Sequence, residues 1–187
     1  MSGTGSPLTI GVDVPWVTSW SQEAQDGIGR CPSVDGALAV GQVDKPGEGR
    51  PLYARNHLFR QRRSVREMLC PMCGEATPDD DRWSQTARST TAGDLRARGF
   101  GAALPPDMAD SQRLLDCGAI APLHRACAEA ALARCPHLGA LADTALKRFP
   151  GAWVVIPLMV EARAPAQRGP GVAAVSFLQI VGVENAS

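Results

Sequence analysis

Six cysteines and three histidines are the residues of this chain best suited to binding a metal ion. Cys70 and Cys73 form a C-x-x-C pair followed by Gly74, a spacing that lets two thiolates face inward around a tight turn. About fifty residues later, His124 and Cys127 are three positions apart, so on a helix both side chains lie on one face. A cysteine knuckle and the first turn of a helix together make a treble-clef arrangement. The pattern therefore predicts a structural Zn²⁺ ion bound by Cys70, Cys73, His124 and Cys127.

Three other residues near the second pair are alternative ligands: Cys117, Cys135 and His137. Pro136 breaks the helix between the last two and the proposed pair. We therefore interpret all three as supporting or packing residues, although any of them could replace one ligand. A cysteine can also be a plain buried apolar residue, which is the interpretation that we favour for the remote Cys31.

The C-x-x-C pair has a redox interpretation as well. Cys70-Pro71-Met72-Cys73 resembles the dithiol motif of glutaredoxins. A thioredoxin-like fold requires an apolar strand directly before that motif, and residues 60–67 are mostly charged. The sequence therefore favours a metal site over a thiol-disulfide oxidoreductase.

An arginine-rich segment precedes the first cysteine pair. Its density of positive charge beside a zinc knuckle could serve contacts to nucleic-acid phosphates. The alternative is a solvated helix face neutralised by nearby acids such as Glu67 and Asp79. The candidate nucleic-acid-binding residues are Arg55, Arg60, Arg62, Arg63 and Arg66.

Enzymatic activity is the weaker functional hypothesis. Zinc-supported nucleases of the His-Asn-His type share the treble-clef skeleton, but they need a general-base histidine close to the metal. If His124 binds zinc, His57 and His137 remain, and no His-His or Asp-His pair precedes the helix. Four protein ligands leave no open position on the ion. The sequence has no glycine-rich phosphate loop, so no nucleotide cofactor is expected. A zinc-stabilised, non-catalytic binding or scaffolding protein is the favoured prediction, with such a nuclease as the alternative and the oxidoreductase as a weaker one.

Composition fits one globular domain. The chain has 187 residues, of which 44% are hydrophobic and only 5% aromatic, so the core must be thin and would benefit from a metal crosslink. The formal net charge of zero argues against a strongly basic nucleic-acid binder. The longest apolar run, residues 152–160, is too short to span a membrane. No signal peptide is recognisable, so a cytoplasmic location is expected, where cysteines act as metal ligands, buried thiols or redox groups rather than as disulfides.

The expected elements describe an α+β domain over residues 8–187, with a zinc-binding core at about 60–148 and a flexible tail at 1–7. Apolar alternation predicts strands, and the last two should pair as a hairpin with Pro157 at a sheet edge or bulge. The predicted strands are 8–14, 37–43, 152–160 and 172–183. Apolar periodicity with proline and glycine boundaries predicts helices at 55–69, 91–98, 106–116, 122–134 and 138–148.

Residues 60–138 resemble a group of small, uncharacterised bacterial zinc-finger-like proteins, some of them associated with phages or mobile elements. The resemblance rests on RQRRSVREMLCPMCG at 60–74, Trp83, the His124/Cys127 pair and CPHL at 135–138. Members of that group place a cysteine at the position of His124, as exchange of one zinc ligand for another would allow. The resemblance implies a zinc-finger-like domain, and from the residues themselves we expect an unidentified protein or nucleic acid as its partner. It brings no established activity.

Overall fold

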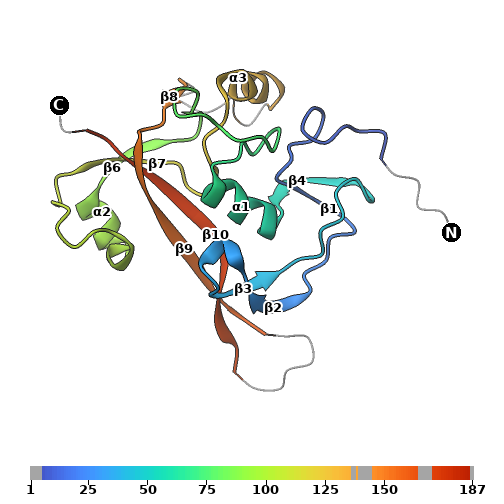
Figure 1. Cartoon of the computed structure of the whole chain (residues 1–187), viewed down its shortest axis with the longest axis horizontal. Helices are drawn as coiled ribbons and strands as arrows, with labels where there is room; N and C mark the ends of the chain where they lie inside the picture. The colour runs from blue at the N-terminus through green and yellow to red at the C-terminus, as the bar shows by residue number, and fades with distance from the viewer. Residues whose placement is uncertain (1–5, 136–137, 139–144, 164–169, 186–187) are drawn as a thin grey trace.

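The computed structural model describes residues 6–135, 138, 145–163 and 170–185. Three short helices separate runs of mostly antiparallel strands, which makes the described chain an α+β protein (Figure 1). The helices are α1 (Leu58–Glu67), α2 (Ala92–Ala97) and α3 (Arg125–Arg134), with short 3-10 turns η1 (Pro32–Val34) and η2 (Gly101–Ala103). The strands are β1 (Thr18–Trp20), β2 (Gly27–Arg30), β3 (Leu38–Gly41), β4 (Pro51–Asn56), β5 (Trp83–Ser84), β6 (Arg88–Thr91), β7 (Arg113–Asp116), β8 (Lys147–Arg148), β9 (Ala152–Ala162) and β10 (Val172–Val183).

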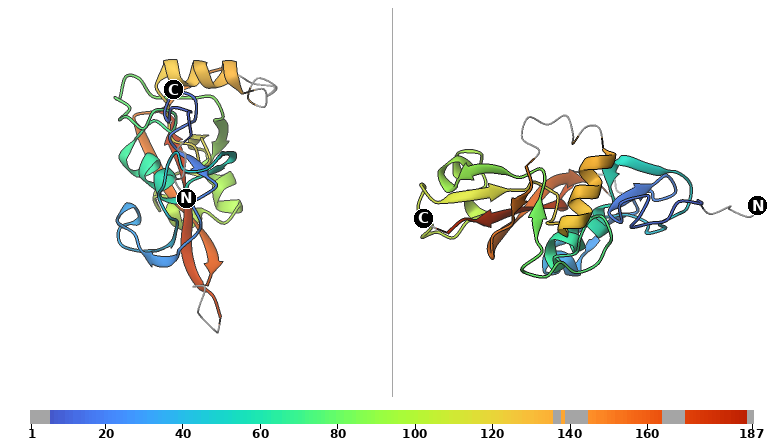
Figure 2. Two further views of the ribbon diagram at one scale, coloured as in Figure 1. Left: turned by 90° about the vertical axis from the view of Figure 1, so that its right-hand side faces the viewer. Right: turned by 90° about the horizontal axis from the view of Figure 1, so that it is seen from above.

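Strand β10 organises the main sheet. One of its edges pairs with β9 along almost the whole length of the strand, which confirms the predicted hairpin. Its other edge pairs first with β3, in parallel, and then with β7, in antiparallel orientation, giving the order β2-β3-β10-β7-β6. Because β9 pairs only with β10 among the described strands, Pro157 lies on an edge, as predicted. The far end of the hairpin projects beyond the body of the molecule (Figure 2).

Side chains of α1 fill the gap that β3 and β7 leave along the edge of β10. The Gln61 amide donates to the Leu178 carbonyl at 2.7 Å and accepts from the Leu178 N–H at 3.0 Å, as a neighbouring strand would. Arg62 donates to the Ser176 carbonyl at 2.8 Å. Backbone polar groups that are buried without a partner are costly, so these side chains complete the hydrogen bonding of β10.

The two faces of the sheet have separate cores. Leu115 and Ile180 pack with Val65 of α1, whereas Leu114 and Val181 pack with the α2 residues Ala92 and Leu95. Consecutive residues of a strand point to opposite faces, so β7 and β10 each contribute to both cores. Figure 1 shows α1 and α2 on opposite sides of the β9–β10 ribbon.

Local signals account for the helix ends. His57 begins α1, where its Nδ1 accepts from the Arg60 N–H, and Met68 ends it in a left-handed conformation. Thr91 and Asp94 form a reciprocal capping box at the start of α2. The helices predicted at 55–69, 91–98 and 122–134 are therefore present in shortened form, and the strands predicted at 37–43, 152–160 and 172–183 are confirmed.

Two predicted elements are wrong. Residues 8–14 form turns and a single bridge between Ile10 and Val14 rather than a strand. The helix predicted at 106–116 is instead a loop followed by β7, because Leu114 and Leu115 are buried on opposite faces of a sheet. Most of the helix predicted at 138–148 lies outside the described residues, and its last two residues form β8. Most of the predicted tail, 1–7, also lies outside them.

Within the described parts of the chain, none of the helices is long and apolar enough to cross a membrane.

Candidate metal centre

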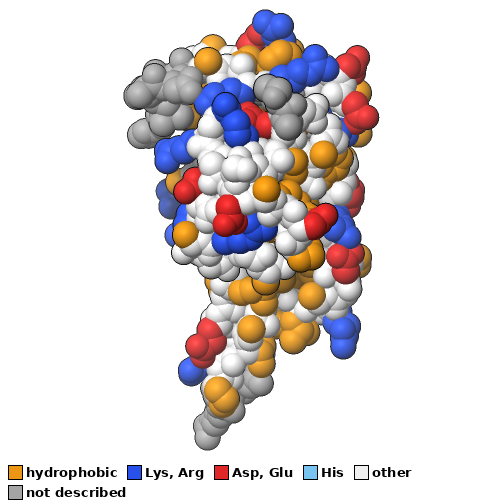
Figure 3. Space-filling view, turned by 90° about the vertical axis from the view of Figure 1, so that its left-hand side faces the viewer, with side chains coloured by type: hydrophobic (Ala, Val, Ile, Leu, Met, Phe, Trp, Pro, Cys, Tyr) orange, Lys and Arg blue, Asp and Glu red, His pale blue; other side chains and the backbone are white. Residues whose placement is uncertain are grey.

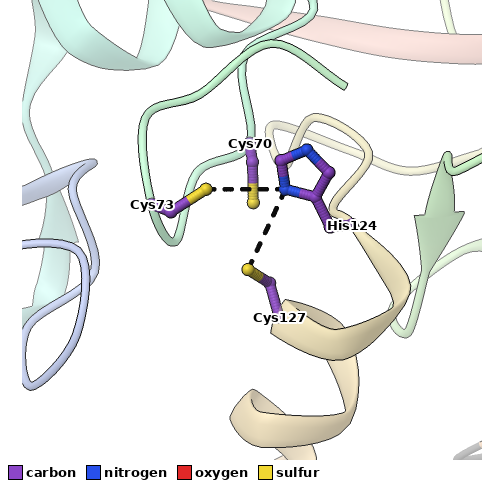
Figure 4. A group of neighbouring side chains, drawn as sticks. All are labelled: Cys70, Cys73, His124 and Cys127. Carbon is purple, nitrogen blue, oxygen red and sulfur yellow. Dashed lines mark hydrogen bonds between the residues drawn. The ribbon is translucent and has the colours of Figure 1, made fainter. Parts of the chain in front are cut away.

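The four predicted ligands come together in one cluster. Their ligand atoms, three sulfurs and one imidazole nitrogen, all lie within 4.8 Å of one another. His124 Nδ1 is 3.5 Å from Cys73 Sγ and 3.9 Å from Cys127 Sγ (Figure 4). A tetrahedral zinc ion with ordinary bond lengths separates a sulfur ligand from a nitrogen ligand by about 3.6 Å. The spacing therefore suits one small ion at the centre of the group.

The first pair lies on a tight turn that follows α1. The Cys70 N–H donates to the Glu75 carbonyl at 2.7 Å, and the Gly74 N–H donates to the Cys70 carbonyl at 2.8 Å. Gly74 has φ +83°, and a side chain there would meet the Trp16 ring at 2.9 Å. Only glycine fits this position without strain or displacement of the tryptophan.

An N-terminal segment lies against the outside of this turn. The Trp16 N–H donates to the Met72 carbonyl at 2.8 Å, and the Val17 N–H donates to the Pro71 carbonyl at 3.0 Å. A Cβ atom at Gly11 would be 3.3 Å from the Cys73 carbonyl oxygen. The conformation of the cysteine turn is therefore linked to that of residues 11–17, far from it in sequence.

The second pair begins helix α3. His124 is the residue before the helix and Cys127 is its third residue, so both side chains are directed to the same side. His124 Nε2 lies 3.1 Å from the Ala76 carbonyl, an acceptor that places the proton on Nε2 and leaves the Nδ1 lone pair free for a metal. The Arg125 N–H donates to Asp81 Oδ1 at 2.8 Å, which fixes the start of the helix.

Electrostatics also favour a cation here. Burial raises the pKa of the Cys70 thiol, although backbone groups of Cys73, His124 and Met72 hydrogen-bond to it and oppose this effect. Burial and then the charges of Cys70 and Cys73 raise the pKa of Cys127 to about 12. Three thiolates this close repel one another, and a divalent cation that prefers sulfur is the group that would let them ionise together.

The two alternative ligands that the structure describes, Cys117 and Cys135, lie outside the cluster. Cys117 is buried in the core beside α1 and is not part of the cluster. Cys135 follows the last turn of α3, eight residues beyond Cys127, which is about 12 Å along a helix axis. Cys31 is a buried thiol of the core, as predicted. His137 lies outside the described residues.

The predicted phosphate-binding arginines do not form one exposed surface. Arg60 and Arg62 are each 2% exposed and bond to groups of the protein interior. Arg63 pairs with Glu67 at 2.9 Å, and Arg66 pairs with Asp35. Arg55 is exposed on β4. The expectation of a shared phosphate-binding face is therefore wrong for Arg60 and Arg62, because α1 is packed against the sheet rather than solvated on all sides.

A second group of metal-ligating residue types surrounds Arg60. Glu23, Asp44 and His57 have ligand atoms within 4.8 Å of one another. Arg60 donates to Glu23 through NH1 at 2.8 Å and NH2 at 2.9 Å, and it also pairs with Asp44. Both ring nitrogens of His57 are used, one near the Val43 carbonyl at 3.1 Å and the other at the Arg60 N–H. Sequence reasoning missed this group, because no motif links Glu23, Asp44 and His57, which are at least 13 positions apart in the sequence.

In comparisons with protein-family models, curated proteins and solved structures, no match to this chain was found.

Proposed function

We propose that this chain is a non-catalytic binding or scaffolding protein whose fold is stabilised by one Zn²⁺ ion at Cys70, Cys73, His124 and Cys127. The observation that carries the proposal is the convergence of three sulfurs and one imidazole nitrogen within 4.8 Å. A bound ion would join the turn after α1, the start of α3 and, through Trp16, the N-terminal segment. In a core with few aromatic residues, such a crosslink would contribute much of the stability.

Zinc is proposed over other ions because of the ligand chemistry. A set of three cysteines and one histidine with tetrahedral spacing is a common structural zinc set, and it leaves no position for an activated water. The motifs at 60–74 and 135–138, from which we expect a resemblance to small bacterial zinc-finger-like proteins with phage or mobile-element members, agree with this proposal. A cytoplasmic location also fits it, since reduced thiols are needed to bind the ion.

The two enzymatic alternatives have less support. A His-Asn-His nuclease would need a free histidine near the metal, and both ring nitrogens of the fully buried His57 are already used. A redox dithiol normally has its reactive cysteine exposed at a helix N-terminus. Cys70 is 0% exposed, and the C-x-x-C pair lies in a turn.

A groove of about 1190 Å³ is lined by residues of β1, β4 and the β9–β10 hairpin, among others, and by none of the four cluster residues. This groove therefore does not give a substrate access to the metal cluster.

Of the two partner classes considered, we favour a protein. The candidate arginines were the main argument for nucleic acid, and two of them are buried. The projecting β9–β10 hairpin instead carries exposed apolar side chains, among them Met159 and Val160 at 53% and 40% exposure. Apolar side chains are visible along this narrow end of the molecule in Figure 3. Exposed apolar surface is more typical of protein interfaces than of phosphate contacts.

The proposal is tested by metal analysis of the purified full-length chain. We expect one zinc per chain, and Co²⁺ substitution should give the absorption spectrum of a tetrahedral site with sulfur ligands. Cys73→Ser should lose the bound zinc. Cys135→Ser is the matched control, because it removes a partly buried cysteine of the same region that lies outside the cluster.

Two outcomes would overturn the proposal. One is a wild-type chain that folds cooperatively without any metal and gains no stability when zinc is added. The other is a zinc ion that carries an exchangeable water molecule in a chain that hydrolyses a phosphodiester substrate. The bound water and the hydrolysis should then both be lost in Cys73→Ser. That result would assign an enzyme rather than a binding module.

A further inference from the structure

Arg62 carries a buried positive charge that has no neutralising partner in the described part of the chain. Its side chain is 2% exposed. NH1 donates to the Ser176 carbonyl at 2.8 Å and NH2 to the Val40 carbonyl at 3.0 Å, both of them uncharged acceptors. Nε is buried and has no hydrogen-bond partner. Arg60, two residues earlier on α1, also has an Nε without a partner, but its charge is paired with the carboxylates of Glu23 and Asp44.

A buried charge without a counter-charge is unfavourable, because carbonyl dipoles replace only part of the lost hydration. Arginine cannot escape this cost by releasing its proton, because a guanidinium group stays protonated in proteins. Arg62 therefore carries an unneutralised charge, and its Nε donor has no hydrogen-bond partner. An anion bound in a cavity beside such a residue would supply the missing counter-charge.

Arg62 lines a cavity of this kind. A pocket of about 190 Å³ lies between α1 and the β2–β3 hairpin, with Phe59 and Cys31 among its apolar residues. Arg30 also lines it, and its exposed guanidinium is held in place by a hydrogen bond from NH1 to the Gly36 carbonyl at 3.0 Å. Two arginines from different elements thus border one small pocket, which is far larger than a single water molecule requires.

We propose that this pocket binds a small oxyanion, a phosphate or carboxylate group, between Arg62 and Arg30. Arg62 supplies the buried charge and Arg30 a second donor at the rim, the arrangement in which guanidinium groups recognise planar or tetrahedral oxyanions. The exposed carboxyl group of Asp26 also borders the pocket and opposes an anion by repulsion. It should therefore limit the affinity. The pocket contains none of the four metal-cluster residues, so this site is independent of the zinc proposal.

Inorganic phosphate and acetate are the probes, each titrated into the zinc-loaded full chain in low-chloride buffer and followed by calorimetry and thermal unfolding. We expect saturable binding of at least one probe and a rise in Tm, because a ligand that binds only the folded state stabilises it. Saturation by phosphate alone would identify a phosphate site, and saturation by acetate alone a carboxylate site.

Two surface variants test the residues without disturbing the core. Arg30→Gln should weaken binding about tenfold, the usual effect of losing one charge-assisted hydrogen bond. Asp26→Asn should strengthen binding several-fold by removing the repulsion. Arg50→Gln, an exposed arginine outside the pocket, is the control and should leave affinity unchanged. The proposal is overturned if neither probe saturates the folded wild type, or if Arg30→Gln and Arg50→Gln bind equally well.

Discussion

Two clusters of metal-ligating residue types lie near the two ends of α1, and they differ in what neutralises their charge. In one, Glu23, Asp44 and His57 surround the guanidinium of Arg60, which occupies the place that a cation would take. In the other, three cysteines and His124 converge with no arginine or lysine paired to any of them among the described residues. Proximity of ligand atoms is therefore not sufficient evidence of a metal site. The cluster must also lack an internal counter-ion.

The two clusters also use their histidines differently. His57 has both ring nitrogens engaged by the protein, so it cannot offer a lone pair to an ion. His124 has one nitrogen at the Ala76 carbonyl, and the other points at the sulfurs of Cys73 and Cys127. The first histidine is a helix cap that supports an ion pair, and the second is oriented as a ligand.

Removing zinc should give the largest difference between the two regions. Structural zinc contributes about 10–16 kcal/mol in apparent terms in small domains, so a strong chelator should abolish cooperative folding around the cysteine cluster. We expect hydrogen exchange to accelerate first in residues 11–17, 68–77 and 123–134, before α1. If the protection of these segments is unchanged after the metal is removed, the cluster has no structural role.

Replacing Glu23 should affect the other cluster without loss of zinc. Glu23→Gln leaves the buried Arg60 with the half-exposed Asp44 as its remaining carboxylate, and breaking a buried pair costs about 3–5 kcal/mol. Asp44→Asn is the control and should cost about 1 kcal/mol or less, because Asp44 is 46% exposed. Urea unfolding with parallel zinc analysis measures both. Equal effects of the two variants would contradict the assignment of Glu23 as the principal partner.

The cluster around Arg60 should also make the stability of the protein sensitive to acid. Burial acts to raise the pKa of Glu23, but hydrogen bonds from Arg60 and the Trp20 N–H hold it below the usual 4.5. The contribution of Glu23 to the free energy of unfolding is therefore fully present above pH 4.5. It is lost as the pH falls through the lower pKa of Glu23 in the folded state. Burial and the charge of Arg60 lower the pKa of His57 below 6.5, so the unfolded state takes up more protons and stability already declines below pH 6.5. Glu23→Gln should abolish the lower of these two declines, as measured by urea unfolding at several pH values.

The smallest expected effect separates backbone strain from packing in the cysteine turn. Gly74→Ala should cost about 2–3 kcal/mol, because it adds a contact with Trp16 to the strain of a positive φ. Gly99→Ala has a similar φ of +89° with no neighbouring atom within 4 Å, so it should cost about 1 kcal/mol. Only Gly74→Ala should also speed the transfer of zinc to a competing chelator. If both variants behave alike, the Trp16 contact contributes nothing.

The metal cluster was predictable because its four ligands belong to two short sequence motifs. The C-x-x-C-G turn and the H-x-x-C pair each fix a local geometry, and only their meeting in space had to be inferred. The shortened helices and the C-terminal hairpin were predictable for the same reason, from local periodicity and from glycine and proline boundaries. The failure at residues 106–116 has the opposite cause. Pro106 and Gly118 are typical helix boundaries, but burial of Leu114 and Leu115 on both faces of the sheet imposed a strand.

The arginine-rich segment 55–66 separates what the amino-acid sequence determined from what the tertiary structure decided. Its amino-acid sequence favours a helix, because it has apolar residues at both ends and neither glycine nor proline between His57 and Leu69. The chemistry of each arginine was decided by tertiary structure alone. Packing against β10 placed Arg60 among carboxylates, Arg62 beside a pocket and without a paired carboxylate among the described residues, and Arg63 on the surface beside Glu67. A charged side chain has the same local preferences in each setting, and its energy depends on which groups from distant segments replace its water.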